Sequence, residues 1–277
     1  NVMVKKSGKI LILLLGIILA IIFLFPVYIL VINSFKSLRA IYSDILAFPI
    51  GDIFTLTNYL DAFFRLDYVK SFLNSLLITG SGTICILMFS SMAAWVLART
   101  RTRTSQIIFM IFSVSMLVPF QCVMLPLIAE MGSVNMLNRA GLVFMNIGFA
   151  SGFSIMMFHG FINNVPLELE YAAAIDGCPR WKTFFVIVMP LLKSVYATVA
   201  VLQAMTLWND YLLPSLTINK DGMQTLPLKT YLFFGQFAKR WDLGTAGLVM
   251  VMLPVIIFYI ACQKYIIKGV TEGAVKG

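Results

Sequence analysis

Six long apolar stretches constrain the fold of this chain more than any other feature of its sequence. A helix needs about 20 apolar residues to cross the roughly 30 Å hydrocarbon core of a bilayer, and every stretch is at least that long. They are Ile10–Ile32, Ser71–Ala98, Ser105–Ile128, Gly141–Ile162, Ser194–Leu213 and Leu243–Gln263. Only Asp210 is charged among them. We therefore predict an all-α, multi-pass membrane protein with six transmembrane helices.

Composition excludes several other classes of protein. Of 277 residues, 60% are hydrophobic and 12% are charged, about half the charge of a soluble domain. This excludes a soluble enzyme, a disordered chain and a disulfide scaffold. The net charge of +9 is spread between apolar runs, so we expect the lipid bilayer and not nucleic acid as a partner. Four scattered cysteines and one histidine, His159, predict no metal site.

The first apolar stretch has two interpretations. Lysines precede it, as they do in a cleaved signal peptide. However, its 23 uncharged residues exceed a signal's apolar region of roughly 7–15, and no A-x-A cleavage site follows Ile32. We expect a retained transmembrane helix.

The density of Lys and Arg predicts the orientation. Three arginines lie between Arg99 and Arg103, and three lysines lie just before Ile10. Both termini are then cytoplasmic. Residues 1–70 would form the first helix and an outer loop, and residues 71–277 a five-helix core. That core includes an inner loop at 163–193 and a cytoplasmic tail at 264–277.

The inner loop contains a short helix with start and stop signals. Pro166 suits a first helical position and Asn164 a cap, while Asp176-Gly177 supplies a stop. Leu167, Tyr171, Ala174 and Ile175 would share one face. A second helix would follow over Arg180–Pro190. Such an amphipathic helix–turn–helix is suited to docking into a groove of another protein.

The same loop resembles a known family. Glu170–Cys178 is followed by Ile187-Val188-Met189-Pro190, with nine residues between Gly177 and Ile187. This run is similar to the EAA loop of ABC-importer permeases, E-A-A-x-x-x-G-x9-I-x-L-P. Three positions depart from that pattern: Tyr171 replaces the usual Glu, Cys178 a common Ala, and Met189 a Leu.

Further motifs resemble the carbohydrate-uptake branch of that family, and specifically its maltose-type second permease. Asn58-Tyr59 with Phe72–Leu76, then Trp208–Pro214, then Lys268–Gly277 match in order. The last segment is similar to the ending G-L-T-x-G-A-V-K-G. The resemblance covers the chain from about residue 58 to its last residue.

The resemblance implies a permease subunit of an importer for mono- or oligosaccharides, without enzymatic activity of its own. No G-x-x-x-x-G-K-[ST] run occurs, so we expect ATP-Mg to be used by partner ATPases and no cofactor to bind this chain. The implied partners are a second homologous permease, two cytoplasmic ABC ATPase subunits and an extracellular or periplasmic sugar-binding protein. Residues expected to couple to the ATPase are Glu168, Glu170, Tyr171, Ala172, Ala173, Asp176 and Gly177. Gly273, Ala274 and Lys276 would contact the ATPase through the C-tail.

Polar residues and one tryptophan in the spans are candidates for the sugar path, since sugars bind to polar groups and aromatic rings. They are Asn74, Gln121, Asn146, Gln203, Trp208, Asn209 and Asp210. Asp210 is a functional-site hypothesis because charges in spans are costly. Its position near the outer helix end also suits helix capping, or docking to the partner permease or the binding protein.

Three other functions compete with this one. An ion-gradient-driven secondary transporter usually has mid-membrane charges and an internal repeat, neither of which is evident. A membrane enzyme would need paired carboxylates, a zinc-spaced histidine set or a nucleophile with its base. A channel subunit would need no docking loop. A homodimer is the alternative to pairing with a second permease.

Overall fold

The computed structural model describes the chain over residues 2–235 and 239–274, and its side chains over 8–235 and 239–264. Within these ranges the protein is helical and contains no β-strand, only isolated bridges such as Lys36 with Phe54. The chain divides into two compact units. Unit one comprises residues 1–68 and 229–254, and unit two residues 69–228 and 255–277.

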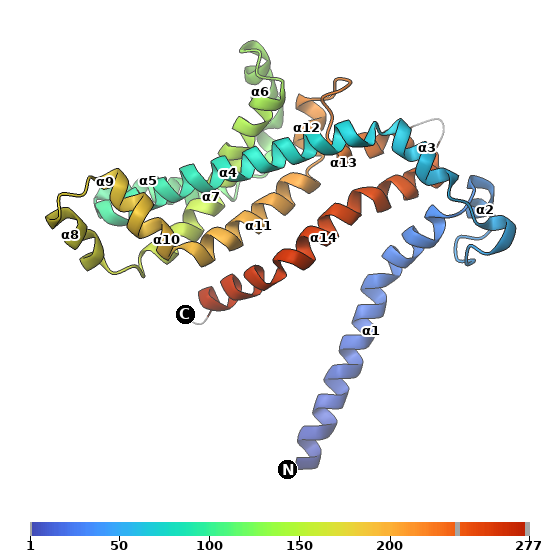
Figure 1. The fold of residues 1–277 in the computed structure, drawn as a ribbon, viewed down its shortest axis with the longest axis horizontal. Coiled ribbons are helices and arrows are strands. Elements are labelled where there is room, and N and C mark those ends of the chain that lie inside the picture. Colours follow the sequence, from blue (N-terminus) through green and yellow to red (C-terminus); the bar gives the residue numbers. More distant parts are fainter. Residues whose placement is uncertain (1, 236–238, 275–277) are drawn as a thin grey trace. The chain divides into compact units, whose positions relative to one another are not determined.

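Unit one contains α1 and a folded segment over residues 35–67 (Figure 1), which corresponds to the predicted outer loop and is called the outer segment below. After α1 (Val2–Ser34) come α2 (Leu38–Ser43), a 3-10 turn (Gly51–Ile53) and α3 (Thr57–Arg65). The segment predicted as a simple outer loop therefore carries short helices. The unit also takes the end of α13 (Leu226–Thr230), a 3-10 turn (Tyr231–Phe233) and the beginning of α14 (Trp241–Ala274).

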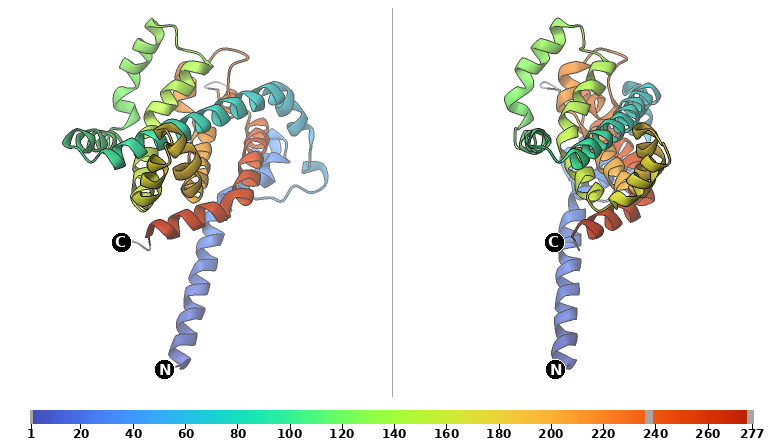
Figure 2. Two further views of the ribbon diagram at one scale, coloured as in Figure 1. Left: turned by 60° about the vertical axis from the view of Figure 1, so that its left-hand side comes forward. Right: turned by 90° about the vertical axis from the view of Figure 1, so that its left-hand side faces the viewer.

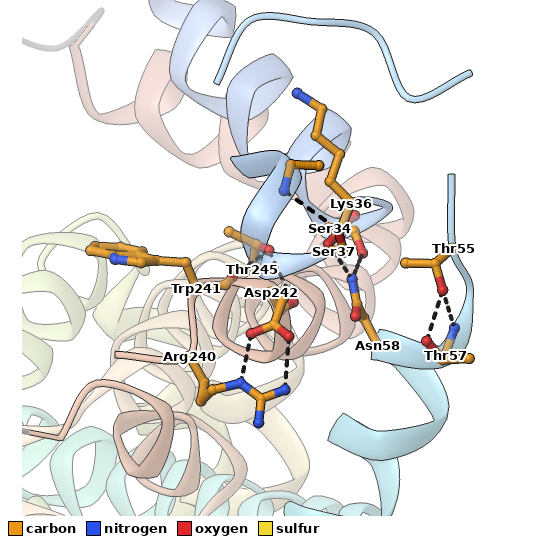
Figure 3. A network of polar contacts seen from close by, with 11 residues as sticks. Ser34, Lys36, Ser37, Thr55, Thr57, Asn58, Arg240, Trp241, Asp242 and Thr245 are labelled. Carbon is orange, nitrogen blue, oxygen red and sulfur yellow. Dashed lines mark hydrogen bonds and ion pairs between the residues drawn. The ribbon is translucent and has the colours of Figure 1, made fainter. Parts of the chain in front are cut away.

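Buried hydrogen bonds fix the exit from α1 (Figure 3). The amide of Asn58 donates to the carbonyls of Ser34 at 3.0 Å and Lys36 at 2.8 Å. The ammonium of Lys36, whose side chain is fully buried, donates to the carbonyls of Asp44 and Ile45, both at 3.1 Å. Burial lowers the pKa of Lys36, and the nearby Asp44 charge opposes that shift. The outer segment is thus tied to the last turn of α1 by side-chain to backbone bonds.

Replacing Asn58 tests this arrangement. Asn58→Ala leaves two carbonyls without their amide donor, at a cost of about 1–3 kcal/mol for each buried group left unpaired. Asn58→Asp adds carboxylate oxygens that face those carbonyls, so we expect a larger loss. Thermal unfolding of the purified protein in detergent should rank wild type above alanine and alanine above aspartate. Equal melting temperatures for Asp and Ala would contradict the assignment.

Unit two contains most of the helices. In chain order they are α4 (Tyr68–Thr100), α5 (Arg103–Ser115), α6 (Phe120–Ser133), α7 (Arg139–Ile162), α8 (Leu167–Ile175), α9 (Arg180–Thr183), a π-helical turn (Phe184–Val188), α10 (Met189–Leu191), α11 (Lys193–Asn209) and α12 (Leu212–Thr217). Its largest buried cluster joins α4, α7, α11 and the π turn through residues such as Ala94, Phe158, Phe184 and Val199. The π turn of this cluster contacts both α8 and α9, which belong to the yellow part of the ribbon in Figure 2.

The described helices support four to six membrane spans. Four are long and apolar enough to cross a bilayer: Gly8–Ser34, Tyr68–Thr100, Arg139–Ile162 and Trp241–Lys264. They agree with four of the six predicted stretches. The count reaches six only if each of two bent helix pairs forms one span.

The predicted continuous helix over Ser105–Ile128 is wrong. The chain bends by 103° between α5 and α6. Pro119 stands at the N-cap of α6 in an extended conformation. Proline lacks the amide hydrogen that a continuing helix needs and disfavours helical geometry in the residue before it, which accounts for the break.

The predicted fifth helix, Ser194–Leu213, is also too long. α11 ends at Asn209, Asp210 adopts an extended conformation, and a separate helix starts at Leu212. On its other side α11 is bent by 81° from Arg180–Leu191. Hydropathy alone could not locate either change of direction.

Gly152 allows α7 to approach α5 closely. A Cβ atom at this position would lie 2.8 Å from the carbonyl oxygen of Phe112 and 3.0 Å from the hydroxyl of Ser115. We expect Gly152→Ala to cost about 1–3 kcal/mol as overpacking, because a helix backbone cannot move aside locally. Gly148→Ala, on the same helix with open space around its Cβ, is the control. Thermal unfolding in detergent should separate the two variants, and equal stability would show that the helices adjust freely.

Candidate functional site

Local sequence explains how α8 begins and ends. Pro166 is its N-cap, and Glu168 and Glu170 stand in its first turn, where negative charge complements the helix dipole. Gly177 follows the C-cap Asp176 with φ +73°, a conformation that L side chains rarely adopt. The predicted stop is confirmed. The predicted start is corrected in two details, because Pro166 lies one position before the helix and Asn164 donates to Gly160 at 3.0 Å instead of capping α8.

One side of α8 is exposed. Glu168, Tyr171, Ala172 and Ile175 follow the i, i+3, i+4, i+7 spacing of a single helical face, and all four are exposed. Tyr171 retains 63% of its accessible surface and Ile175 86%. Large apolar side chains exposed at helical spacing are typical of a surface that a partner covers.

The opposite side of α8 is attached to the end of α4. Arg99 Nε donates to Glu170 Oε1 at 2.8 Å, and Trp95 Nε1 donates to Glu170 Oε2 at 3.1 Å. A terminal nitrogen of Arg99 also donates to the carbonyl of Val165 at 2.9 Å. Both charged side chains are largely shielded from solvent, with 7% of the Arg99 and 12% of the Glu170 side-chain surface exposed. Glu170 therefore faces inward and does not belong to the exposed face.

Trp95 also contacts the second helix of the inner loop. The guanidinium of Arg180 lies 5.6 Å from the centre of its ring, within cation–π range. The ring of Phe184, in the π turn, lies 5.3 Å away. The predicted second helix over Arg180–Pro190 forms as α9, the π turn and α10, ending at Leu191. Phe184 is buried and Trp181 is exposed.

Sequence reasoning did not find Trp95 or Arg99 as site residues. Arg99 entered only as a charge that orients the chain. A usable signal was present, because positions four apart share a helix face, and a Trp and an Arg so placed in the last turns of a span can meet an acidic residue of the next inner loop.

The candidates for the sugar path have local partners. The Asn74 amide donates to the carbonyls of Gly222 and Gln224 at 3.1 and 3.0 Å. The Gln203 amide donates to the Ser154 hydroxyl at 3.0 Å. The Asn209 amide donates to the Met205 carbonyl one helical turn earlier, at 2.8 Å. These amides contribute to helix and loop packing.

The other four candidates differ in exposure. Asp210 accepts from the backbone amide of Leu212 at 3.1 Å, which is the capping role left open by the sequence. Asn146 is buried and Gln121 is exposed. Trp208 is 9% exposed, its ring lies 5.6 Å from that of Phe72, and its indole N–H is buried with no hydrogen-bond partner in the described part of the chain. No hydrogen bond described here joins two of the seven candidates.

The C-terminal candidates are described only in part. Gly273 and Ala274 belong to the last helical residues of α14. Lys276 lies outside the described residues.

Comparison with known proteins decides the family. A family of binding-protein-dependent transport system inner membrane components matches residues 86–272. The chain belongs to this family. The permease is therefore a multi-pass membrane component of a transport system, and the predicted membership among ABC-importer permeases is confirmed. An ion-gradient-driven transporter finds no support.

Relatives cover nearly all of the permease. It is 44% identical over 97% of both chains to the probable starch degradation products transport system permease protein AmyC of Thermoanaerobacterium thermosulfurigenes. It is 35% identical over 98% of both chains to the melibiose/raffinose/stachyose import permease protein MelC of Bacillus subtilis (strain 168). In fold it is similar to a chain of a bacterial ABC transporter that imports alginate, with a TM-score of 0.80 and 24% identity, covering 94% of the permease and 96% of that chain.

Proposed function

We propose that this permease is one of two membrane subunits of an ABC importer for oligosaccharides. The observation that carries the proposal concerns the inner hairpin, which consists of α8 and the helical segment Arg180–Leu191. In it, α8 presents an exposed face while its other side is bound to α4. Relatives named for starch products and for melibiose, raffinose and stachyose favour a neutral sugar as substrate. In this proposal both termini and the hairpin are cytoplasmic, and the EAA-like loop lies between the fourth and fifth spans.

The hairpin docks into a cleft of a cytoplasmic ATPase subunit. Tyr171, Ala172 and Ile175 contact that subunit, Glu168 lies at the edge of the contact, and Gly177 allows close approach. Ala173 packs inward and Asp176 ends the helix. ATP-Mg is bound and hydrolysed by two such partners, since the permease has no P-loop motif. Gly273, Ala274 and Lys276 add a second contact through the C-tail.

Closure of the ATPase pair then displaces α8 and shifts the permease between inward- and outward-facing states. Residues 71–277 form the five-helix core of the permease, and residues 1–70 supply the first helix and the outer segment. A second homologous permease completes the path, and an extracellular or periplasmic sugar-binding protein delivers the substrate. Trp208, whose buried indole N–H has no hydrogen-bond partner among the described residues, is the strongest of the seven candidates for contact with the sugar.

Co-purification and uptake test the proposal. The tagged permease, extracted from its host in mild detergent, should retain a P-loop ATPase and a second six-span protein, identified by mass spectrometry. Proteoliposomes holding that complex and the binding protein should accumulate radiolabelled maltotriose or raffinose only when ATP is enclosed on the ATPase side. Uptake that needs a proton or sodium gradient and no ATP would replace the proposal with the secondary-transporter alternative.

A further inference from the structure

The contact between α4 and α8 is polar. Arg99 holds both the entrance to α8, at the Val165 carbonyl, and its first turn, at Glu170. Trp95 occupies the second oxygen of the same carboxylate. Both oxygens of the Glu170 carboxylate thus accept hydrogen bonds from side chains that lie four residues apart in α4. Because the two bonds differ in direction, they fix the orientation of α8 more firmly than one bond would.

Apolar packing adds little to this attachment. The only side chain of α8 that is buried is Ala173, and a methyl group offers a small contact area. The ion pair is largely shielded from solvent, so removal of one partner leaves the other charge without its counter-ion. Glu170 is therefore the direct connection through which a force on the exposed face of α8 reaches α4.

The second inner helix is tied to the same point. Arg180 stacks on the Trp95 ring, and Phe184 packs against it. Trp95 consequently contacts α8 with its N–H and the α9 region with its ring. Trp95 lies near the C-terminal end of α4, which is a single helix of 33 residues from Tyr68 to Thr100.

We propose that Arg99, Trp95 and Glu170 form a latch that makes α8 move as one body with the cytoplasmic end of α4, so that ATP-driven displacement of α8 is transmitted to the second span. The inference rests on the proposed importer function. It assigns coupling to two α4 residues outside the EAA-like loop, and they are positioning residues that touch neither sugar nor nucleotide. In this chain the carboxylate next to Tyr171 faces inward and connects α8 to α4.

Substitutions in the latch should uncouple the importer. Arg99→Met keeps an unbranched apolar stem and removes the charge and the donors of the side chain. We expect ATPase activity of the reconstituted complex to remain while sugar transported per ATP falls by about tenfold, a typical coupling effect. Arg99→Lys should be intermediate, because an ammonium lacks the fork that reaches Glu170 and Val165 together. Arg103→Met is the control, since it removes an exposed arginine from the same inner turn and has the same effect on charge-directed insertion.

Trp95→Phe tests the latch with a milder change, for the case in which the Arg99→Met complex does not assemble. It removes the N–H donor together with part of the indole ring, and it keeps an aromatic ring for Arg180 and Phe184. We expect it to assemble like wild type and to lower sugar transported per ATP by about threefold or more, consistent with a hydrogen bond to a charged group. If Arg99→Met does not assemble, this variant decides the question.

A distance measurement tests rigid-body movement directly. Spin labels at Val96→Cys on α4 and Leu169→Cys on α8, both at exposed positions, would be placed in a background without the four native cysteines. The wild-type distance distribution should be equally narrow without nucleotide and with trapped ATP, whereas Arg99→Met should broaden it in the trapped state. A wild-type distance that changes between the two states would overturn the latch.

Different outcomes would contradict the importer function and the latch. If the wild-type complex holds no ATPase or needs no ATP, the proposed function fails. If wild type imports with ATP and the Arg99→Met and Trp95→Phe complexes transport as much sugar per ATP as wild type, the latch is wrong and the importer stands.

Discussion

Ile175→Arg is expected to release the ATPase subunit from this permease while leaving the permease folded in the membrane. Ile175 ends α8 with 86% of its surface exposed, so its replacement removes little packing within the described chain. In the assembled importer the side chain would be buried at the centre of the docking face. Placing a charge in an apolar contact should cost at least about 2 kcal/mol, the threshold of a binding hot spot and about thirtyfold in affinity.

Three measurements check this expectation. The amount of permease in isolated membranes and its melting temperature in detergent should match wild type, whereas the ATPase recovered by affinity purification should fall sharply. Ile175→Met, which conserves volume and apolar character, should retain the ATPase. Full recovery with Ile175→Arg would show that the exposed face of α8 is not the docking surface.

The sequence predicted much of the architecture because lipid imposes a simple rule on composition. A long uncharged run must form a helix, since unpaired backbone groups are too costly in hydrocarbon. Four of the six predicted spans appear as single helices for that reason. The break before α6 could not be found from hydropathy, because Pro119 and its neighbours are as apolar as the helices they separate.

The inner hairpin was predictable for a different reason. The end of its first helix depends on local chemistry, so Asp176-Gly177 could be identified as the stop of α8 before any tertiary contact was known. The anchoring of Glu170 could not, because its partners lie 71 and 75 residues away in α4. Pairings across such distances depend on how helices pack, which a single sequence does not encode in a local pattern.

The predicted sugar path has the least support from the structure, for a related reason. A polar side chain in a span can face the sugar path, or it can form hydrogen bonds within its own helix and the adjoining loops. The same residue types serve both roles. Asn74 and Asp210 bond to backbone groups, which accounts for their presence without a sugar. Trp208 has no such explanation for its indole N–H and keeps its place as a candidate.

Gly177→Asp is expected to abolish transport while the permease still reaches the membrane. The left-handed conformation of Gly177, at φ +73°, costs an ordinary residue about 1–2 kcal/mol. Apart from its two neighbours in the chain, no atom of the described residues lies within 4 Å of an added Cβ, so the folded permease has room for the side chain. In the proposed complex that space belongs to the ATPase, and we expect uptake of labelled sugar to fall by more than about thirtyfold.

Two further variants separate close approach from a simple helix stop. Asparagine tolerates the left-handed region but has the bulk of aspartate, so Gly177→Asn should also block uptake if the ATPase packs against this position. Gly51→Asn is the matched control, because Gly51 has φ +63° and equally open surroundings in the outer segment, and its uptake should equal wild type. Normal uptake by Gly177→Asn would mean that this glycine serves only to end α8, and that the ATPase does not approach the turn.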